Sequence, residues 1–158
     1  MNRFGLLPSR LAGPALASAL WLLGAAPGGA MTYYLVDNGS WWPADARARI
    51  VAAMDEAVAT FNANCYLNVN VRVNYNTGIP TAQSNYNGEV GFGGNAGYQT
   101  ARVALHEICH YVGTGTTAEW NNRFTSGIWT GAAARHFMKL FDGPGAEINL
   151  SGYHFWPY

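Results

Sequence analysis

The clearest pattern in this chain is an alternation of apolar and polar residues over residues 66–75. One side of the alternation is entirely apolar: Leu67, Val69, Val71, Val73 and Tyr75. A period of two places successive side chains on opposite faces of a β-strand. The segment is therefore predicted to form a strand with one buried face.

Residues 41–64 show a different period. Their apolar residues recur at spacings of three and four, as in an amphipathic helix: Ile50, Met54, Ala57, Val58 and Phe61. Pro43 suits the opening turn of such a helix, because it has no N–H group to donate. We predict a helix over residues 41–64 whose apolar stripe packs on a sheet or on another helix.

Two more helices are expected. One runs from Tyr98 or Gln99 to Val112, and Gly113 after it suits a left-handed terminal residue. The other covers residues 130–141 and is stopped by the Gly-Pro-Gly sequence at 143–145.

The segments between these helices are less regular. Residues 76–87 contain glycine, proline and several asparagines, and we expect an extended loop there. Residues 89–92 are predicted to form a short strand at the edge of a sheet, followed by a turn at 93–95. Together, these elements predict an α+β single domain with a small twisted mixed sheet packed on an N-terminal helix and a second helix.

The composition fits one exported domain. The chain has 158 residues, of which 49% are hydrophobic and 11% charged, and its formal net charge is zero. This balance argues against a nucleic-acid partner, because a protein that binds nucleic acid needs a concentrated basic surface. Arg3 and Arg10 precede an apolar stretch that ends in small residues. Residues 1–30 are therefore predicted to be a signal peptide, with a retained helical anchor or a start at Met31 as alternatives.

This division predicts a secreted or periplasmic domain at residues 31–158, without stable membrane association once the signal peptide is removed. The C-terminal run, residues 153–158, is unusually apolar. It indicates either a buried terminal segment or a chain that is cut short. The oligomeric state stays open.

The most informative residues are 106–110, which read His-Glu-Ile-Cys-His. In a helix, a step of four residues turns about 400°, so His106 and His110 lie on one face and can bind one metal ion. Glu107 lies about 100° further around, where a carboxylate can accept a proton from water activated by the metal. The pattern predicts a zinc site with Glu107 as a general base.

Residues 106–113 also resemble the metzincin clan of the zincin superfamily of metallopeptidases, whose pattern is H-E-x-x-H-x-x-G-x-x-H/D. The resemblance implies a zincin-like fold and peptide-bond hydrolysis. More loosely, residues 33–158 look like secreted bacterial zinc hydrolase domains. In the clan, the third zinc ligand would stand at the position of Thr116, and a threonine hydroxyl is a poor zinc ligand.

The third ligand must then come from elsewhere in the chain. His154 is our first choice, because it lies among aromatic residues where a bound metal would satisfy a half-buried imidazole. The alternatives are His136, Glu119, Glu147 and Asp142.

Two cysteines and five aromatic residues are further candidates for structural or functional roles. Cys65 and Cys109 can form a disulfide or stay as free thiols, and a Cys109 thiolate ligand is a weaker alternative. Five aromatic residues can line substrate pockets, although aromatics more often pack in the core: Tyr111, Trp120, Trp129, Tyr153 and Trp156.

The sequence therefore predicts a secreted zinc peptidase that acts on peptides or proteins. Two alternatives stay open. One is a zinc amide hydrolase for cell-wall or glycan-linked substrates, and the other is a binding or adhesion domain with a structural metal or none.

Overall fold

A computed structural model describes residues 30–152 and 154–156. The predicted signal peptide therefore lies almost wholly outside the described residues, as do Tyr153 and the side chain of Trp156. In the part of the chain that the structure describes, no helix is long and apolar enough to cross a membrane. The fold class is α+β, as predicted.

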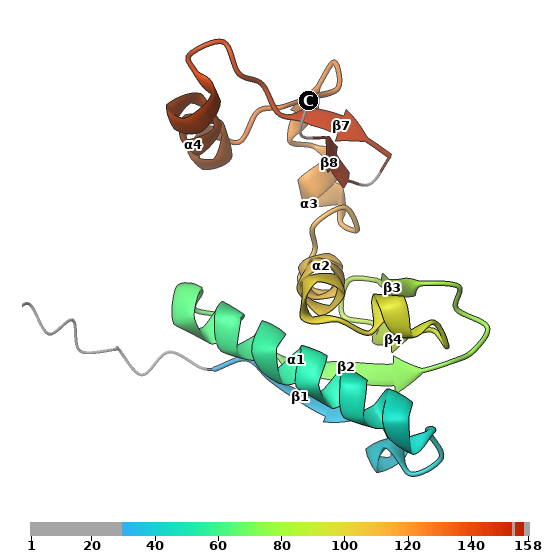
Figure 1. Ribbon diagram of the computed structural model, residues 1–158. Helices are drawn as coiled ribbons and strands as arrows, with labels where there is room; N and C mark the ends of the chain where they lie inside the picture. The colour runs from blue at the N-terminus through green and yellow to red at the C-terminus, as the bar shows by residue number, and fades with distance from the viewer. Residues whose placement is uncertain (1–29, 153, 157–158) are drawn as a thin grey trace, which may run out of the picture.

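The main sheet lies in the N-terminal part of the chain (Figure 1). Its strands follow the order β1-β2-β4-β3. The parallel pairs are β1 with β2 and β2 with β4, whereas β3 runs antiparallel to β4. Their bounds are β1 Thr32–Leu35, β2 Asn70–Tyr75, β3 Ala82–Ser84 and β4 Val90–Phe92. The sheet is therefore mixed, as predicted.

The predicted alternation holds in β2, where Val71 and Val73 are fully buried and Arg72 between them is exposed. The predicted start at Tyr66 is wrong, however, because the strand begins at Asn70. Its neighbour β1 begins at Thr32, which stands opposite Asn70. The residues before Asn70 thus have no β1 residue opposite them, although the Thr32 N–H still donates to the Val69 carbonyl.

Two helices pack on this sheet. Helix α1, Ala44–Asn64, agrees with the predicted first helix, and α2, Ala101–Tyr111, agrees with the second. Figure 1 shows α1 lying across β1 and β2. Ile50 and Met54 of α1 and Ile108 of α2 join the strand residues in one apolar core, where all three are fully buried. A 3-10 helix precedes each of these two helices: η1 Val36–Gly39 before α1 and η2 Ala96–Tyr98 before α2.

The edge of the sheet differs from the prediction. The strand expected at residues 89–92 is β4, but it lies between β2 and β3 and all of its residues are buried. The edge strand is β3, within the segment predicted to be a loop. Gly93 makes this possible, since a Cβ there would collide with the carbonyl oxygen of Ile79. The chain can therefore fold back closely enough for β3 to pair with β4.

The C-terminal part contains a second sheet that the sequence pattern did not predict. Its strands β5, β6, β7 and β8 are antiparallel and follow chain order. Helix α4 agrees with the helix predicted over residues 130–141. The bounds are α3 Ala118–Asn121, β5 Phe124–Thr125, β6 Ile128–Trp129, α4 Ala132–Asp142, β7 Asn149–Ser151 and β8 His154–Trp156.

Candidate metal centre

Helix α2 carries the first two histidines of the site. The Thr100 side chain caps its first turn by accepting a hydrogen bond from the Val103 N–H. At the other end, Gly113 adopts a φ of 118°, a conformation that favours glycine and turns the chain away from the helix. His106 and His110 thus lie one turn apart on a helix with defined ends.

The structure brings His154 of β8 to these two residues. The Nε2 atom of His110 lies 3.2 Å from Nε2 of His106 and 3.1 Å from Nε2 of His154. The candidate ligand atoms of the three residues lie within 4.8 Å of one another. His154, the third ligand favoured from the sequence, therefore lies next to the two histidines of the motif. It is 44 residues away from His110 along the chain.

A backbone contact sets the orientation of the central ring. Nδ1 of His110 lies 2.6 Å from the Thr114 carbonyl oxygen and donates its proton there. In a neutral imidazole, this leaves the Nε2 lone pair free, and Nε2 is the atom that faces the other two rings. Such an outer contact fixes the tautomer of a metal-binding histidine and strengthens it as a ligand.

The donor set fits a divalent metal ion. With metal–nitrogen bonds of 2.0–2.1 Å, a tetrahedral site separates two imidazole nitrogens by about 3.3 Å. The two separations that include His110, 3.2 Å and 3.1 Å, are close to this value. Burial, with a contribution from the neighbouring rings, lowers the pKa of both His106 and His154. Lower pKa values favour the neutral imidazole, which is the form that binds metal. His106, His110 and His154 can therefore hold a metal ion.

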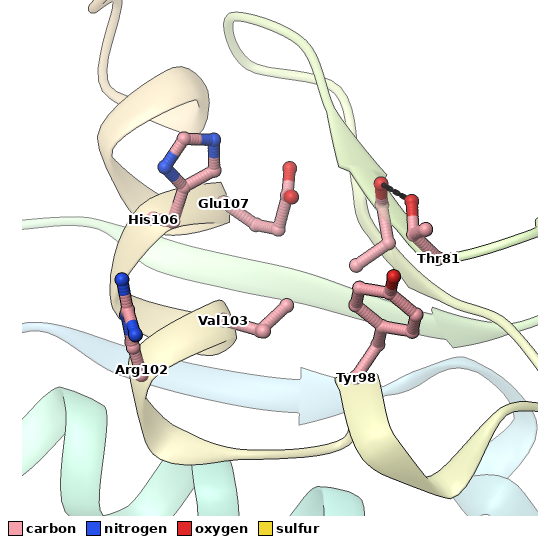
Figure 2. A pocket seen from close by; sticks show the side chains of 7 residues that line it. Thr81, Tyr98, Arg102, Val103, His106 and Glu107 are labelled. Carbon is pink, nitrogen blue, oxygen red and sulfur yellow. Dashed lines mark hydrogen bonds between the residues drawn. The ribbon is translucent and has the colours of Figure 1, made fainter.

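Glu107 lies next to the histidines and is only 6% exposed. Burial raises the pKa of its carboxyl group above the ordinary value. Its Oε2 atom is buried and has no hydrogen-bond partner among the described residues. Figure 2 shows the carboxylate pointing from α2 into the space before β3. The position and the raised pKa suit a group that accepts and returns a proton.

Two cavities open between α2 and β3. The first, of about 280 Å³, is lined by Thr81, Ala82, Tyr98, Arg102 and Val103 together with His106 and Glu107. The second, of about 340 Å³, is lined by Thr81, the residues of β3, Glu107 and the three histidines. Sequence reasoning missed the contribution of β3, because nothing in residues 82–84 marks a strand. Arg102 could have been found, since it stands one helical turn before His106.

The other candidate ligands lie outside the histidine cluster. Thr116 has a structural contact instead: its hydroxyl donates to the His110 carbonyl at 2.7 Å and so satisfies the end of α2. Glu147 is paired with Arg135 at 3.4 Å, and His136 lies on α4 beside Phe137. The two remaining carboxylates are on helices of the C-terminal part: Glu119 on α3 and Asp142 at the end of α4.

Both cysteines are free thiols in the structure, so the disulfide alternative is not adopted. Cys65 is exposed and Cys109 is partly buried. Burial, with a smaller effect of the nearby Cys65, raises the pKa of the Cys109 thiol. A raised pKa disfavours the thiolate that a metal would need.

The aromatic side chains proposed for the pockets lie mainly in packed regions. Tyr111 belongs to the main core, and its hydroxyl donates to the Asn70 carbonyl. Trp120 is buried and contacts both Phe124 and Trp129. The aromatic residue that lines the first cavity is Tyr98.

Comparisons with models of known families, with functionally characterised proteins and with solved structures found no match to this chain. Its function must therefore be inferred from the geometry of the histidine cluster and its surroundings.

Proposed function

We propose that this protein is a secreted zinc-dependent peptidase, with His106, His110 and His154 as zinc ligands and Glu107 as the general base. The observation that carries the proposal is the convergence of three imidazoles beside a buried carboxylate that lacks a partner among the described residues. A structural metal site has no need of such a carboxylate. Three protein ligands are also the usual number for a catalytic zinc ion, because one position stays open.

The chemistry divides between the ion and the protein. A bound zinc ion supplies a Lewis acid that polarises the scissile carbonyl group and makes water acidic near neutral pH. The Glu107 carboxylate accepts a proton from the attacking water and passes it to the leaving amine. The Thr114 carbonyl keeps His110 in the tautomer that presents Nε2 to the ion.

The sheet edge supports an extended peptide as substrate. Strand β3 is the last strand of its sheet and lines the cavity that also contains the three histidines. An edge strand offers backbone N–H and carbonyl groups that an extended peptide can pair with. The edge position predicted for residues 89–92 thus belongs to β3, and β3 is the strand to which we assign peptide binding.

The test is the variant Glu107→Gln, with Glu119→Gln as a matched control. Glu119 is an exposed carboxylate on α3, outside the histidine cluster. Each purified protein is analysed for bound zinc by elemental analysis and for hydrolysis of a quenched fluorescent peptide library. We expect Glu107→Gln to keep its zinc and to lose about 10²- to 10⁴-fold in kcat, because the general base is removed.

The control separates the alternatives. Glu119→Gln should match the wild type in both zinc content and kcat. Zinc binding without hydrolysis of any peptide by the wild type would favour a metal-containing binding domain. Undiminished hydrolysis by Glu107→Gln would show that another group is the base.

A further inference from the structure

The first cavity contains a positive charge that the proposed chemistry does not use. Arg102 lines this cavity together with His106 and Glu107, the proposed ligand and base. Figure 2 shows Arg102 and His106 one above the other on α2, while Thr81 and Tyr98 lie across the cavity. A substrate that extends from the metal centre into this first cavity would therefore pass the Arg102 guanidinium.

Among the residues that the structure describes, Arg102 has no partner that explains its position. Its side chain is exposed, and it makes no ion pair or hydrogen bond with any other described residue. Three of the described arginines are paired with carboxylates, and Arg102 is not among them: Arg49 with Asp45, Arg72 with Glu89, and Arg135 with Glu147. The Arg102 guanidinium is therefore free to bind an anionic group from outside the protein.

The helix itself does not favour a positive charge here. Arg102 is in the first turn of α2, and no acidic residue accompanies it there. The partial positive charge at a helix N-terminus disfavours cations in the first turn, by on the order of a few tenths of a kcal/mol at an exposed position. Neither an ion pair nor the helix dipole accounts for an arginine at this site.

The helical spacing places Arg102 one turn before His106, the proposed zinc ligand. Arg102 stands four residues before His106, which is about 6 Å along a helix. An extended peptide advances about 3.3 Å per residue, so a substrate that runs along α2 presents a side chain near Arg102 within about two residues of the metal centre. The planar guanidinium can bind a carboxylate through two parallel hydrogen bonds.

From these observations we infer that Arg102 is a specificity-determining residue that selects peptides with a carboxylate group close to the scissile bond. This inference rests on the peptidase function proposed above and names its substrate class. The carboxylate can be the side chain of Asp or Glu, or the free C-terminus of the peptide. Arg102 is outside the histidine cluster that could hold the metal, and we assign it a role only in the choice of substrate.

The experiment measures binding separately from hydrolysis. Zinc-loaded Glu107→Gln protein is titrated into fluorescein-labelled peptides, and the Kd is obtained from fluorescence anisotropy. In one set, a single Glu moves one position at a time along an otherwise neutral peptide with an amidated C-terminus, and each member has a matched Gln peptide. In a second set, the Gln peptides have a free C-terminal carboxylate.

We expect the carboxylate to tighten binding by about fivefold at one or two positions, or in the peptides with a free C-terminus, because an exposed charge pair contributes a modest free energy. In the Glu107→Gln protein, the additional substitution Arg102→Gln should abolish this preference for a carboxylate. Adding Arg47→Ala should preserve it, because Arg47 is an exposed arginine of α1 outside both cavities of the metal centre. Higher ionic strength should weaken the preference.

Equal binding of Glu and Gln peptides in every position and with either terminus would overturn the inference. A preference that survives Arg102→Gln would overturn it as well. Hydrolysis by the wild-type protein is assayed in parallel and tests the peptidase function alone. A preference that depends on Arg102, without any hydrolysis, would support carboxylate selection and refute the peptidase.

Discussion

In the N-terminal part of the chain, residues 31–113, strands and helices share one core in which many side chains are fully buried. In residues 114–156, by contrast, only Trp120 and Ile148 are buried among the described hydrophobic side chains. Helix α4 has no buried residue, and its Phe141 is 83% exposed. Because burial of apolar surface is the main stabilising term, we expect residues 114–156 to have a lower local stability than residues 31–113.

The histidine cluster joins these unequal parts. His106 and His110 belong to α2, which packs on the main core, whereas His154 belongs to β8 of the second sheet. A metal ion at the cluster would therefore link the weakly packed residues 114–156 to the well-packed residues 31–113. The contrast suggests that metal binding affects the C-terminal part more than the main core.

The largest expected effect comes from a matched pair of phenylalanine variants. Phe92 is fully buried in β4, and Phe137 is 59% exposed on α4. Phe92→Ala should lower the free energy of unfolding by about 3–5 kcal/mol, because it removes core contacts and leaves a cavity. Phe137→Ala should change it by less than about 0.5 kcal/mol. Urea denaturation followed by circular dichroism measures both, and similar losses would remove the proposed difference between the two parts.

The next effect concerns the ligand from the C-terminal part. We expect His154→Ala to weaken zinc binding by at least about a hundredfold, since even loss of an outer contact to a ligand costs ten- to a hundredfold. His136→Ala is the matched control, because His136 lies on α4 outside the cluster. Competition with a chromogenic chelator gives the two affinities. Equal affinities would exclude His154 as a ligand.

Metal removal should act unevenly along the chain. A metal ion at about ten times its Kd stabilises the bound state by about 1.4 kcal/mol. Chelation should therefore raise amide hydrogen exchange by about tenfold in β7 and β8, while α1 changes little. Exchange is followed by mass spectrometry with and without chelator, and His154→Ala should show no such response. A uniform change in amide hydrogen exchange over all helices and strands would contradict the proposed difference between the two parts of the chain.

The smallest effect concerns the hydroxyl of Thr116. Thr116→Val keeps the shape of the side chain and removes the hydrogen bond to the His110 carbonyl. We expect stability to fall by about 1 kcal/mol, with zinc content unchanged, because the hydroxyl satisfies the end of α2 and is not a ligand. Thermal denaturation and elemental analysis measure the two quantities. Loss of zinc would restore Thr116 as a ligand candidate.

Local periodicity was sufficient to predict the elements that are long enough to repeat it. The spacing of Ile50 and Met54 indicated α1, and the alternation of Val71 and Val73 indicated β2. The helical period likewise placed His106 and His110 on one face, because that relation depends only on the turn per residue. These features required no knowledge of distant contacts.

The sheet edge and the meeting of the three histidines depended on the tertiary structure. Strands β3, β7 and β8 are too short to show a period, and their pairing joins segments that no local pattern relates. His154 was an expectation based on its aromatic neighbours, and only the folded chain brings its Nε2 to 3.1 Å from that of His110. The sequence by itself determined a helix with two histidines and a carboxylate. Pairing of distant strands decided where the third imidazole and the peptide-binding edge lie, because such pairing depends on packing across the whole domain.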